Sequence, residues 1–309
     1  MNPLTGIYAA ASGLRNSLFD HGLLRSRRLA QPVVSVGNLS TGGSGKTPFV
    51  IALGELLKAR NIPFDVLSRG YRRQTGGVLV VDANGAAAHF GDEPLLISRR
   101  LEVSVIVGES RYEAGRFAEE TFDSQLHILD DGFQHRSLAR DFDIVLMTGD
   151  EFKDQLLPSG RLREPLSSLE RADAIVLPAG LPGGQEALDG KLVWRMKRQI
   201  ALLDAPPSPV VFCGIARPEQ FFAQVRALGI APASELAFRD HHSYGRCDID
   251  RLQAAKKELG AGGYVTTEKD AINLGAFIGD FQPLSVAALS ITLDNPNEVV
   301  DTILARTGK

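Results

Sequence analysis

The stretch Val33-Val-Ser-Val36-Gly-Asn-Leu-Ser40-Thr-Gly-Gly-Ser-Gly45-Lys46-Thr47 combines three local patterns. Its β-branched start predicts a short buried strand, and the apolar positions of residues 49–57 predict a helix after it. A glycine-rich turn between a strand and a helix, closed by Gly-Lys-Thr, is the pattern of a P-loop. The stretch therefore predicts an α/β fold of the P-loop NTPase type, with phosphate held at the helix N-terminus.

Each part of this loop has a predicted task. Its glycines let the backbone bend so that N–H groups face phosphate oxygens. Lys46 can reach the β- and γ-phosphates of ATP, and Thr47 can offer its hydroxyl to Mg²⁺. The predicted nucleotide-binding residues are Ser40, Thr41, Gly42, Gly43, Ser44, Gly45, Lys46 and Thr47. Ser40 stands where the usual pattern has glycine, and the alternative is a flexible turn. No G-x-G-x-x-G occurs, which disfavours a dinucleotide fold.

Short apolar runs alternate with helical patterns along the first two thirds of the chain. Runs of four to six apolar or β-branched residues separated by helices predict a mostly parallel sheet flanked by helices. The strand candidates are Val33–Val36, Phe64–Leu67, Val78–Val81, Val103–Val107, His127–Leu129, Ile144–Met147 and Ala174–Leu177.

A stretch with three prolines, Asp204–Pro209, predicts a linker. Four further runs could form a second, smaller sheet: Val210–Phe212, Glu235–Phe238, Tyr264–Thr266 and Leu284–Ala287. We therefore expect a P-loop domain at 1–205, a smaller α/β domain at 206–296 and a C-terminal helix at 297–309. The sequence does not indicate where that helix docks.

Composition excludes several classes of protein. Hydrophobic residues make up 44% of the 309 residues, enough for a sizeable core. The formal net charge of -3 argues against a strongly basic nucleic-acid binder. Cys213 and Cys247 are the only cysteines, so a disulfide framework or a cysteine zinc site is not expected, and a reducing cytosolic setting fits. No apolar run is long enough for a transmembrane helix, and the N-terminus lacks a signal-peptide pattern.

Residues 3–24 have the pattern of an amphipathic helix, with apolar side chains at spacings of three and four. Arg25, Arg27 and Arg28 follow it directly. Such a helix could lie in a membrane interface and hold anionic headgroups. It could also pack on the protein's own core, and the periodicity does not separate these two alternatives.

Two adjacent acids, Asp130 and Asp131, end the strand candidate His127–Leu129. In P-loop proteins an acid at the end of a neighbouring strand holds Mg²⁺, directly or through water. We therefore predict a metal site formed by Thr47, Asp130 and Asp131. The alternative is a plain turn, for which Asp131-Gly132 would suffice.

Other polar motifs are ambiguous on their own. Asp92 could cap a helix or accept a hydroxyl proton. Asp240-His241-His242 could handle protons or be structural. Thr266-Thr-Glu-Lys-Asp270 could cap a helix or line a cleft with its charges. Arginines on loops at the carboxyl edge of a sheet suit anionic substrates; the candidates are Arg111, Arg116, Arg161 and Arg163.

Taken together, these segments resemble the tetraacyldisaccharide 4'-kinases of lipid A biosynthesis. The matching motifs run in family order across nearly the whole chain, and Asp-Asp-Gly-Phe-Gln-His with Ser-Arg-Gly-Tyr is far more specific than a P-loop. They are Val36–Pro48, Leu67-Ser-Arg-Gly-Tyr71, Gly91-Asp-Glu-Pro94, Leu129-Asp-Asp-Gly-Phe-Gln-His135, Leu157–Glu164, Phe238-Arg-Asp-His-His242 and Thr266–Asp270.

The resemblance implies a kinase that moves the γ-phosphate of ATP to the 4'-hydroxyl of tetraacyldisaccharide 1-phosphate and so forms lipid IV-A. It implies a peripheral protein at the cytoplasmic face of the bacterial inner membrane, which favours membrane contact for the N-terminal helix. It also implies that Asp92 and His241 pair as catalytic residues, with Lys46 neutralising charge. His242 stays an alternative partner of Asp92. The implied substrate-binding residues are Tyr71, Arg111, Gln134, His135, Arg161 and Arg163.

Two other functions remain open at this point. A P-loop kinase or ligase of a soluble metabolite would not need the amphipathic N-terminal segment. A nucleotide-driven switch or maturation factor would hydrolyse nucleotide slowly and change partners; the Asn-Lys-x-Asp motif that would favour a GTP-dependent switch is missing from the sequence.

Overall fold

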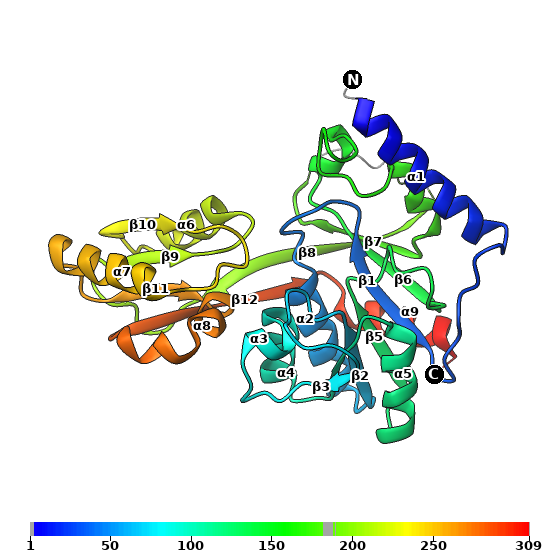
Figure 1. Cartoon of the computed structure of the whole chain (residues 1–309), viewed down its shortest axis with the longest axis horizontal. Coiled ribbons are helices and arrows are strands. Elements are labelled where there is room, and N and C mark those ends of the chain that lie inside the picture. Colours follow the sequence, from blue (N-terminus) through cyan, green and yellow to red (C-terminus); the bar gives the residue numbers. More distant parts are fainter. Residues whose placement is uncertain (1–2, 182–187, 189, 309) are drawn as a thin grey trace.

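The computed structural model describes residues 3–181, 188 and 190–308. Within these residues twelve strands form one sheet, in the order β10-β9-β11-β12-β8-β7-β6-β1-β5-β2-β4-β3. Figure 1 shows a larger and a smaller lobe joined by the long strands β8 and β12. The strands are β1 (Val33–Asn38), β2 (Phe64–Ser68), β3 (Leu79–Val80), β4 (Val105–Val107), β5 (Leu126–Asp130), β6 (Phe142–Leu146), β7 (Ala174–Pro178), β8 (Leu192–Ala201), β9 (Val210–Cys213), β10 (Ser234–Ala237), β11 (Tyr264–Thr267) and β12 (Leu284–Leu293).

Helices cover both faces of this sheet. The α-helices are α1 (Pro3–Asp20), α2 (Lys46–Ala59), α3 (Ala87–Phe90), α4 (Asp92–Leu101), α5 (Arg111–Thr121), α6 (Pro218–Ala227), α7 (Arg246–Leu259), α8 (Glu268–Leu274) and α9 (Pro296–Thr307). Short 3₁₀ helices include η1 (Asp150–Lys153), η2 (Leu166–Arg171) and η4 (Gly275–Asp280).

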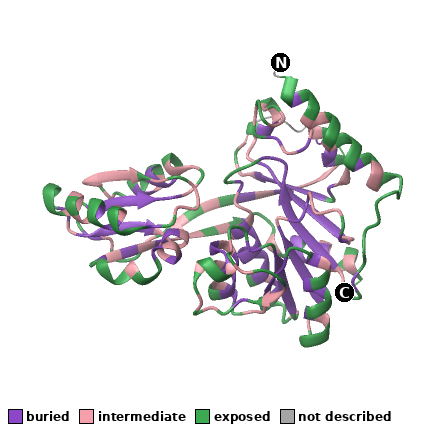
Figure 2. Ribbon diagram, viewed as in Figure 1, coloured by how far each residue is buried: buried purple, intermediate pink, exposed green. Residues whose placement is uncertain are grey.

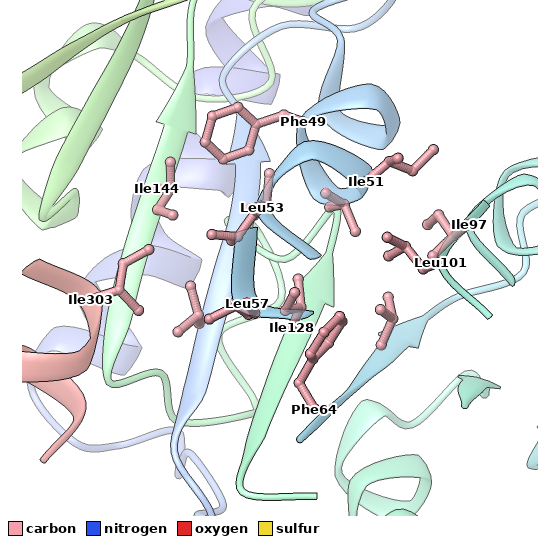
Figure 3. Packing of buried hydrophobic residues seen from close by; sticks show 14 of the residues in the cluster. Phe49, Ile51, Leu53, Leu57, Phe64, Ile97, Leu101, Ile128, Ile144 and Ile303 are labelled. Atoms are coloured by element: carbon pink, nitrogen blue, oxygen red, sulfur yellow. The ribbon is translucent and has the colours of Figure 1, made fainter. Parts of the chain in front are cut away.

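The large lobe has a mostly parallel sheet buried between two helical layers. Strands β1, β2, β5 and β6 are buried at every position, which explains their nearly continuous apolar sequences. One core cluster joins α2, α4 and α9 to one face, with Phe49, Leu53 and Leu57 of α2 packed near Ile128 and Ile144 (Figure 3). A second cluster places Ala114 and Ala118 of α5 on the opposite face. The predicted fold class is confirmed.

Helix α9 docks on the core of the large lobe, which the sequence did not predict. Val299, Val300 and Ile303 are buried in the cluster that α2 also joins, and Arg60 pairs with Asp301 at 3.0 Å. The chain therefore returns from the small lobe and ends on the lobe where it began (Figure 1).

The expectation of a second, separate sheet needs correction. Residues Leu284–Ala287 of β12 pair in parallel with β11, and Ala288–Leu293 pair antiparallel with β8. One long strand thus belongs to both lobes and makes the hydrogen-bonded ladder continuous. Strand β8 was not predicted, because in Leu192–Ala201 basic residues interrupt the apolar ones and no uniform apolar run results.

Helix α1 does not bury its apolar stripe in the protein's own core. Its buried residues are Thr5 and Asn16, whereas Leu4, Ile7 and Leu14 are 58%, 67% and 62% exposed. Figure 2 shows α1 mostly exposed along the rim of the large lobe. Within the described residues, no helix is both long and apolar enough to cross a membrane.

Candidate active site

The P-loop connects β1 to α2 in the predicted context. Gly45 precedes α2 with a φ of 86°, a left-handed conformation that suits glycine. A Cβ atom at Gly45 would lie 2.8 Å from Nη2 of Arg198, a residue of β8. The guanidinium of Arg198 donates to the carbonyls of Gly43 and Ser44. The backbone conformation therefore requires glycine at the last position of the motif, and the guanidinium of Arg198 lies directly over it.

Ser40, the departure from the usual motif, has a defined partner. Its Oγ donates to Oε1 of Glu151 at 2.9 Å. Glu151 is 1% exposed, and its Oε2 accepts from the backbone N–H groups of Thr148 and Gly149 at 2.9 and 3.0 Å. Sequence reasoning missed Glu151, because nothing in Asp150–Lys153 forms a recognisable motif. This buried carboxylate ties the start of the P-loop to the segment after β6.

Lys46 lies in a network of charged and polar groups at the ends of β1 and β5. Its Nζ is 3.4 Å from Oδ1 of Asp131 and donates to Oδ1 of Asn38 at 3.2 Å. Nη2 of Arg163 lies 2.9 Å from the same oxygen of Asp131. Burial opposes ionisation of Asp131, but Lys46 and Arg163 outweigh it and hold the pKa of this carboxyl below its usual range. Asp131 is therefore paired with both cations in this structure.

Asp130 has an environment different from that of its neighbour. It is 2% exposed; Oδ2 accepts from Oγ of Ser68 at 3.1 Å, while buried Oδ1 has no partner among the described residues. Burial, with Glu93 and Asp131 nearby, raises the pKa of Asp130 to about 7. A divalent cation would supply the partner that Oδ1 lacks and favour the ionised form.

The predicted set of Thr47, Asp130 and Asp131 is suitable for Mg²⁺. Thr47 is buried in the first turn of α2, at the predicted position. Among the described residues no three His, Cys, Asp or Glu side chains converge on one metal position. Mg²⁺ usually keeps several waters and takes further ligands from substrate phosphates. The protein therefore needs to supply only one or two carboxylates and a hydroxyl as ligands.

Asp92 and His241 meet between the lobes. Oδ2 of Asp92, at the start of α4, is 2.8 Å from Nδ1 of His241, in the loop after β10. Burial opposes ionisation of Asp92, but His241 and Lys269 lower its pKa to about 2. Asn273 also donates to Oδ2, at 3.2 Å. The two residues line a pocket of about 680 Å³, together with Tyr71 and Ala271.

His242 takes a different position. Its Nε2 is 3.0 Å from Oδ2 of Asp248, and its ring stacks on Phe238 with centroids 4.8 Å apart. The geometry therefore assigns the contact with Asp92 to His241 and gives His242 a packing position in the small lobe.

Most of the other candidate residues gather around the carboxyl edge of the large-lobe sheet. Arg111 is 6% exposed, and its pKa is lowered to about 10 by burial and by Arg69. Burial, with Arg111 nearby, lowers the pKa of His135 to about 4. Gln134 donates to the carbonyl of Asn38 at 3.0 Å. These side chains therefore lie beside the P-loop strand and the Asp130–Asp131 pair.

Three further candidates lie farther apart. Tyr71 packs against the ring of His241, with centroids 5.2 Å apart. Arg161 pairs with Asp150 at 3.3 Å and Asp154 at 3.5 Å, and its side chain is 47% exposed. Arg116 pairs with Glu120 on the exposed side of α5, away from the groups described above.

Helix α1 contacts the loops that carry these residues. The hydroxyl of Tyr8 donates to the carbonyl of Arg163 at 2.9 Å, and Nη2 of Arg15 donates to the carbonyl of Gln134 at 2.7 Å. Asn16 donates to Glu164 at 2.7 Å. The polar side of α1 therefore packs on the loops that carry Gln134 and Arg163, while Ile7 and Leu14 are exposed.

Comparison with known proteins decides the family. The family described as "Tetraacyldisaccharide-1-P 4'-kinase" matches residues 1–308. The chain belongs to this family. It is 46% identical to the tetraacyldisaccharide 4'-kinase of Koribacter versatilis, with 98% of each chain covered, and 38% identical to that of Aquifex aeolicus, with 89% of each covered. A crystal structure of LpxK from Aquifex aeolicus in complex with ATP superposes with a TM-score of 0.79 at 34% identity, covering 99% of this chain and 98% of that one.

Proposed function

We propose that this family member transfers the γ-phosphate of ATP to the 4'-hydroxyl of tetraacyldisaccharide 1-phosphate and so forms lipid IV-A. Family membership over residues 1–308 supports the substrate pair. The observation that carries the proposal is the 2.8 Å contact between Asp92 and His241, formed between the two lobes of a chain that also carries a P-loop. A nucleotide switch protein would need no such pair for accepting a hydroxyl proton.

The P-loop residues bind and orient the phosphates of ATP. Backbone N–H groups of Gly42–Thr47 and the N-terminus of α2 face the phosphate oxygens, and Lys46 adds a positive charge. Thr47, Asp130 and Asp131 would hold Mg²⁺, which would supply positive charge to offset that of the phosphates. Phosphoryl transfer depends mostly on such positioning and neutralisation.

Asp92 accepts the proton of the attacking hydroxyl. Its pKa of about 2 keeps the carboxylate ionised at neutral pH, which is the form that can accept a proton. His241 donates to the carboxylate and fixes its orientation. Because His241 belongs to the small lobe, closure of the lobes assembles the pair, which limits transfer to water.

The remaining candidates bind the lipid acceptor. Arg111, Arg161 and Arg163 attract its 1-phosphate, and Gln134, His135 and Tyr71 contact the sugars. Helix α1 lies in the cytoplasmic face of the inner membrane, where its exposed Ile7 and Leu14 contact acyl chains. This places the loops under α1 next to the membrane, from which the acceptor is drawn.

The test is transfer of labelled phosphate from ATP to purified tetraacyldisaccharide 1-phosphate in detergent micelles. We expect a labelled lipid that requires Mg²⁺ and disappears in Lys46→Ala. Hydrolysis of ATP without labelled lipid would instead favour a nucleotide-driven switch. Transfer to a soluble acceptor alone would favour a kinase of a small metabolite.

The base assignment gives a separate prediction in the same assay. Asp92→Asn keeps the shape of the side chain but removes the proton acceptor, so kcat should fall by about 10² to 10⁴. Asp250→Asn, on the exposed side of α7, is the matched control and should keep its activity. A kcat of Asp92→Asn within about threefold of wild type would contradict the assignment, given that expected range.

A further inference from the structure

Lys269, from the Thr266–Asp270 motif, is a buried cation next to the Asp92–His241 pair. It lies on α8 in the small lobe, and its side chain is 16% exposed. Its Nζ is 3.3 Å from Oε1 of Glu93, 3.7 Å from Oδ2 of Asp92 and 3.8 Å from Oδ1 of Asp240. Burial opposes the charge, but these three carboxylates raise the pKa of Lys269 above its usual value. The side chain is therefore an ammonium ion.

The same ammonium contacts the second ring nitrogen of His241. Nζ of Lys269 is 3.2 Å from Nε2 of His241. An ammonium group has three donors and no acceptor, so Nε2 must present its lone pair to it. A neutral imidazole with a lone pair on Nε2 carries its proton on Nδ1, which is the nitrogen that faces Asp92 at 2.8 Å.

The other groups around His241 are consistent with this arrangement. Oδ2 of Asp240 could accept from a protonated Nε2, but it lies 3.9 Å away, too far for a hydrogen bond. Arg72 donates to the backbone carbonyl of His241, at 2.8 Å, and Tyr71 packs against the ring. Glu93 contacts Lys269, and Asn273 donates to Asp92; neither side chain is directed at a ring nitrogen of His241.

We infer that Lys269 is a positioning residue that fixes His241 as the neutral tautomer with its proton on Nδ1, directed at Asp92. An imidazolium would point an N–H at the ammonium, which repels it, and the opposite tautomer would leave Asp92 without this donor. His241 therefore orients Asp92, and Asp92 alone is left to accept the hydroxyl proton. The catalytic part of this inference rests on the proposed role of Asp92 as acceptor of the hydroxyl proton.

Lys269 also contacts the large lobe. Asp92 and Glu93 start α4 in the large lobe, whereas Lys269 and His241 belong to the small lobe. Parting of the lobes would remove Nδ1 from Asp92 and Nζ from Glu93 together. The contact between Lys269 and Nε2 of His241 lies within the small lobe, so the imidazole keeps its tautomer when the lobes part and meets Asp92 only when they close.

The experiment is NMR of the full chain with ¹⁵N-labelled histidine at neutral pH. The chain has six histidines, and His241→Gln identifies the missing pair of ring signals. We expect Nδ1 of His241 to be protonated and Nε2 to be unprotonated in the wild type. In Lys269→Met we expect averaged signals from two exchanging tautomers, and in Lys269→Arg the wild-type pattern. Lys257→Met, on the exposed face of α7, is the control.

Kinetics separate positioning from a merely structural role. We expect kcat of Lys269→Met to fall by about 10²-fold, with KM for ATP unchanged, because a misplaced reacting group costs about that much. Lys269→Arg should recover part of the loss. A protonated Nε2 in the wild type, or unchanged ring signals in Lys269→Met, would overturn the inference. If Lys269→Met does not fold, the wild-type spectrum still tests which ring nitrogen of His241 carries the proton. This test does not depend on whether the protein phosphorylates the lipid.

Discussion

Ser40 occupies the first position of the P-loop, and its hydroxyl donates to Oε1 of buried Glu151. Removing that hydroxyl in Ser40→Ala would leave Oε1 of Glu151 buried without a donor, which costs about 1–3 kcal/mol of unfolding free energy. We expect a matching loss in chemical denaturation without nucleotide, and a higher KM for ATP.

Ser44→Ala is the matched control for this prediction. Oγ of Ser44 is also buried, but it has no partner among the described residues, so its removal leaves no orphaned group behind. Equal stability losses in the two variants would contradict the role given to the Ser40–Glu151 bond.

Residue-scale prediction from sequence succeeded where a motif is local. The strand, glycine-rich turn and helix of the P-loop lie where the sequence predicts them, because their conformation follows from neighbouring residues. The contact between Asp92 and His241 joins residues 149 positions apart, and only resemblance to a family suggested it. Glu151 escaped notice, because its importance comes from burial against Ser40 and not from its own neighbours.

At the scale of elements, strand β5 is tied to β2 and α5 through His127. Nδ1 of His127 is 2.8 Å from Oδ1 of Asp65, and Nε2 is 3.5 Å from Oε1 of Glu119; the imidazole is fully buried. Burial alone would lower the pKa of His127, but the two carboxylates raise it above its usual value.

This ion cluster predicts a pH-dependent stability. A raised folded-state pKa stabilises the fold below the unfolded-state value near 6.5, and that contribution is lost as pH rises through the folded-state pKa. His127→Gln should therefore lose more unfolding free energy at pH 6 than at pH 9, measured by chemical denaturation. His89→Gln, on the exposed face of α3, should change little at either pH. A loss that grows with pH would reverse the assigned sign.

Helix α1 gives the prediction for membrane contact. Ile7→Asp places a charge on its exposed apolar side and forfeits about 1.5–3 kcal/mol of apolar burial, so binding to anionic phospholipid vesicles should weaken about tenfold or more. Ser17→Asp adds the same charge to an exposed polar position and is the control. Equal vesicle binding by both variants in sedimentation would argue against this helix as the contact surface.

Two arginines of the basic cluster after α1 pair with acids of the protein itself. Arg27 pairs with Glu113 at 2.9 Å and Arg28 with Asp141 at 2.5 Å. Both acids lie far away in sequence, so composition near the helix could not reveal this compensation. The apolar side chains of α1 are therefore the better targets for mutation.

At the scale of the whole molecule, two long strands carry the connection between the lobes. The sequence predicted a linker at Asp204–Pro209 but not the continuity of the sheet, since pairing between β8 and β12 is set by tertiary structure. The division into 1–205, 206–296 and a C-terminal helix remains a proposal. Limited proteolysis that first cuts near Asp204 would support it.

Contacts from Arg72 help to hold the lobes together at the site. Arg72, from the segment after β2 in the large lobe, donates through Nη1 to the carbonyls of His241 at 2.8 Å and Asp240 at 3.2 Å. Because these bonds hold the backbone of His241 towards Asp92, Arg72→Ala should lower kcat up to about 10²-fold. KM for ATP should not change, because Arg72 does not contact the P-loop. Arg116→Ala removes an exposed arginine of the same lobe that pairs with exposed Glu120, and it should behave as wild type. If Arg72→Ala instead raised KM for ATP at an unchanged kcat, lobe docking would not set the position of His241.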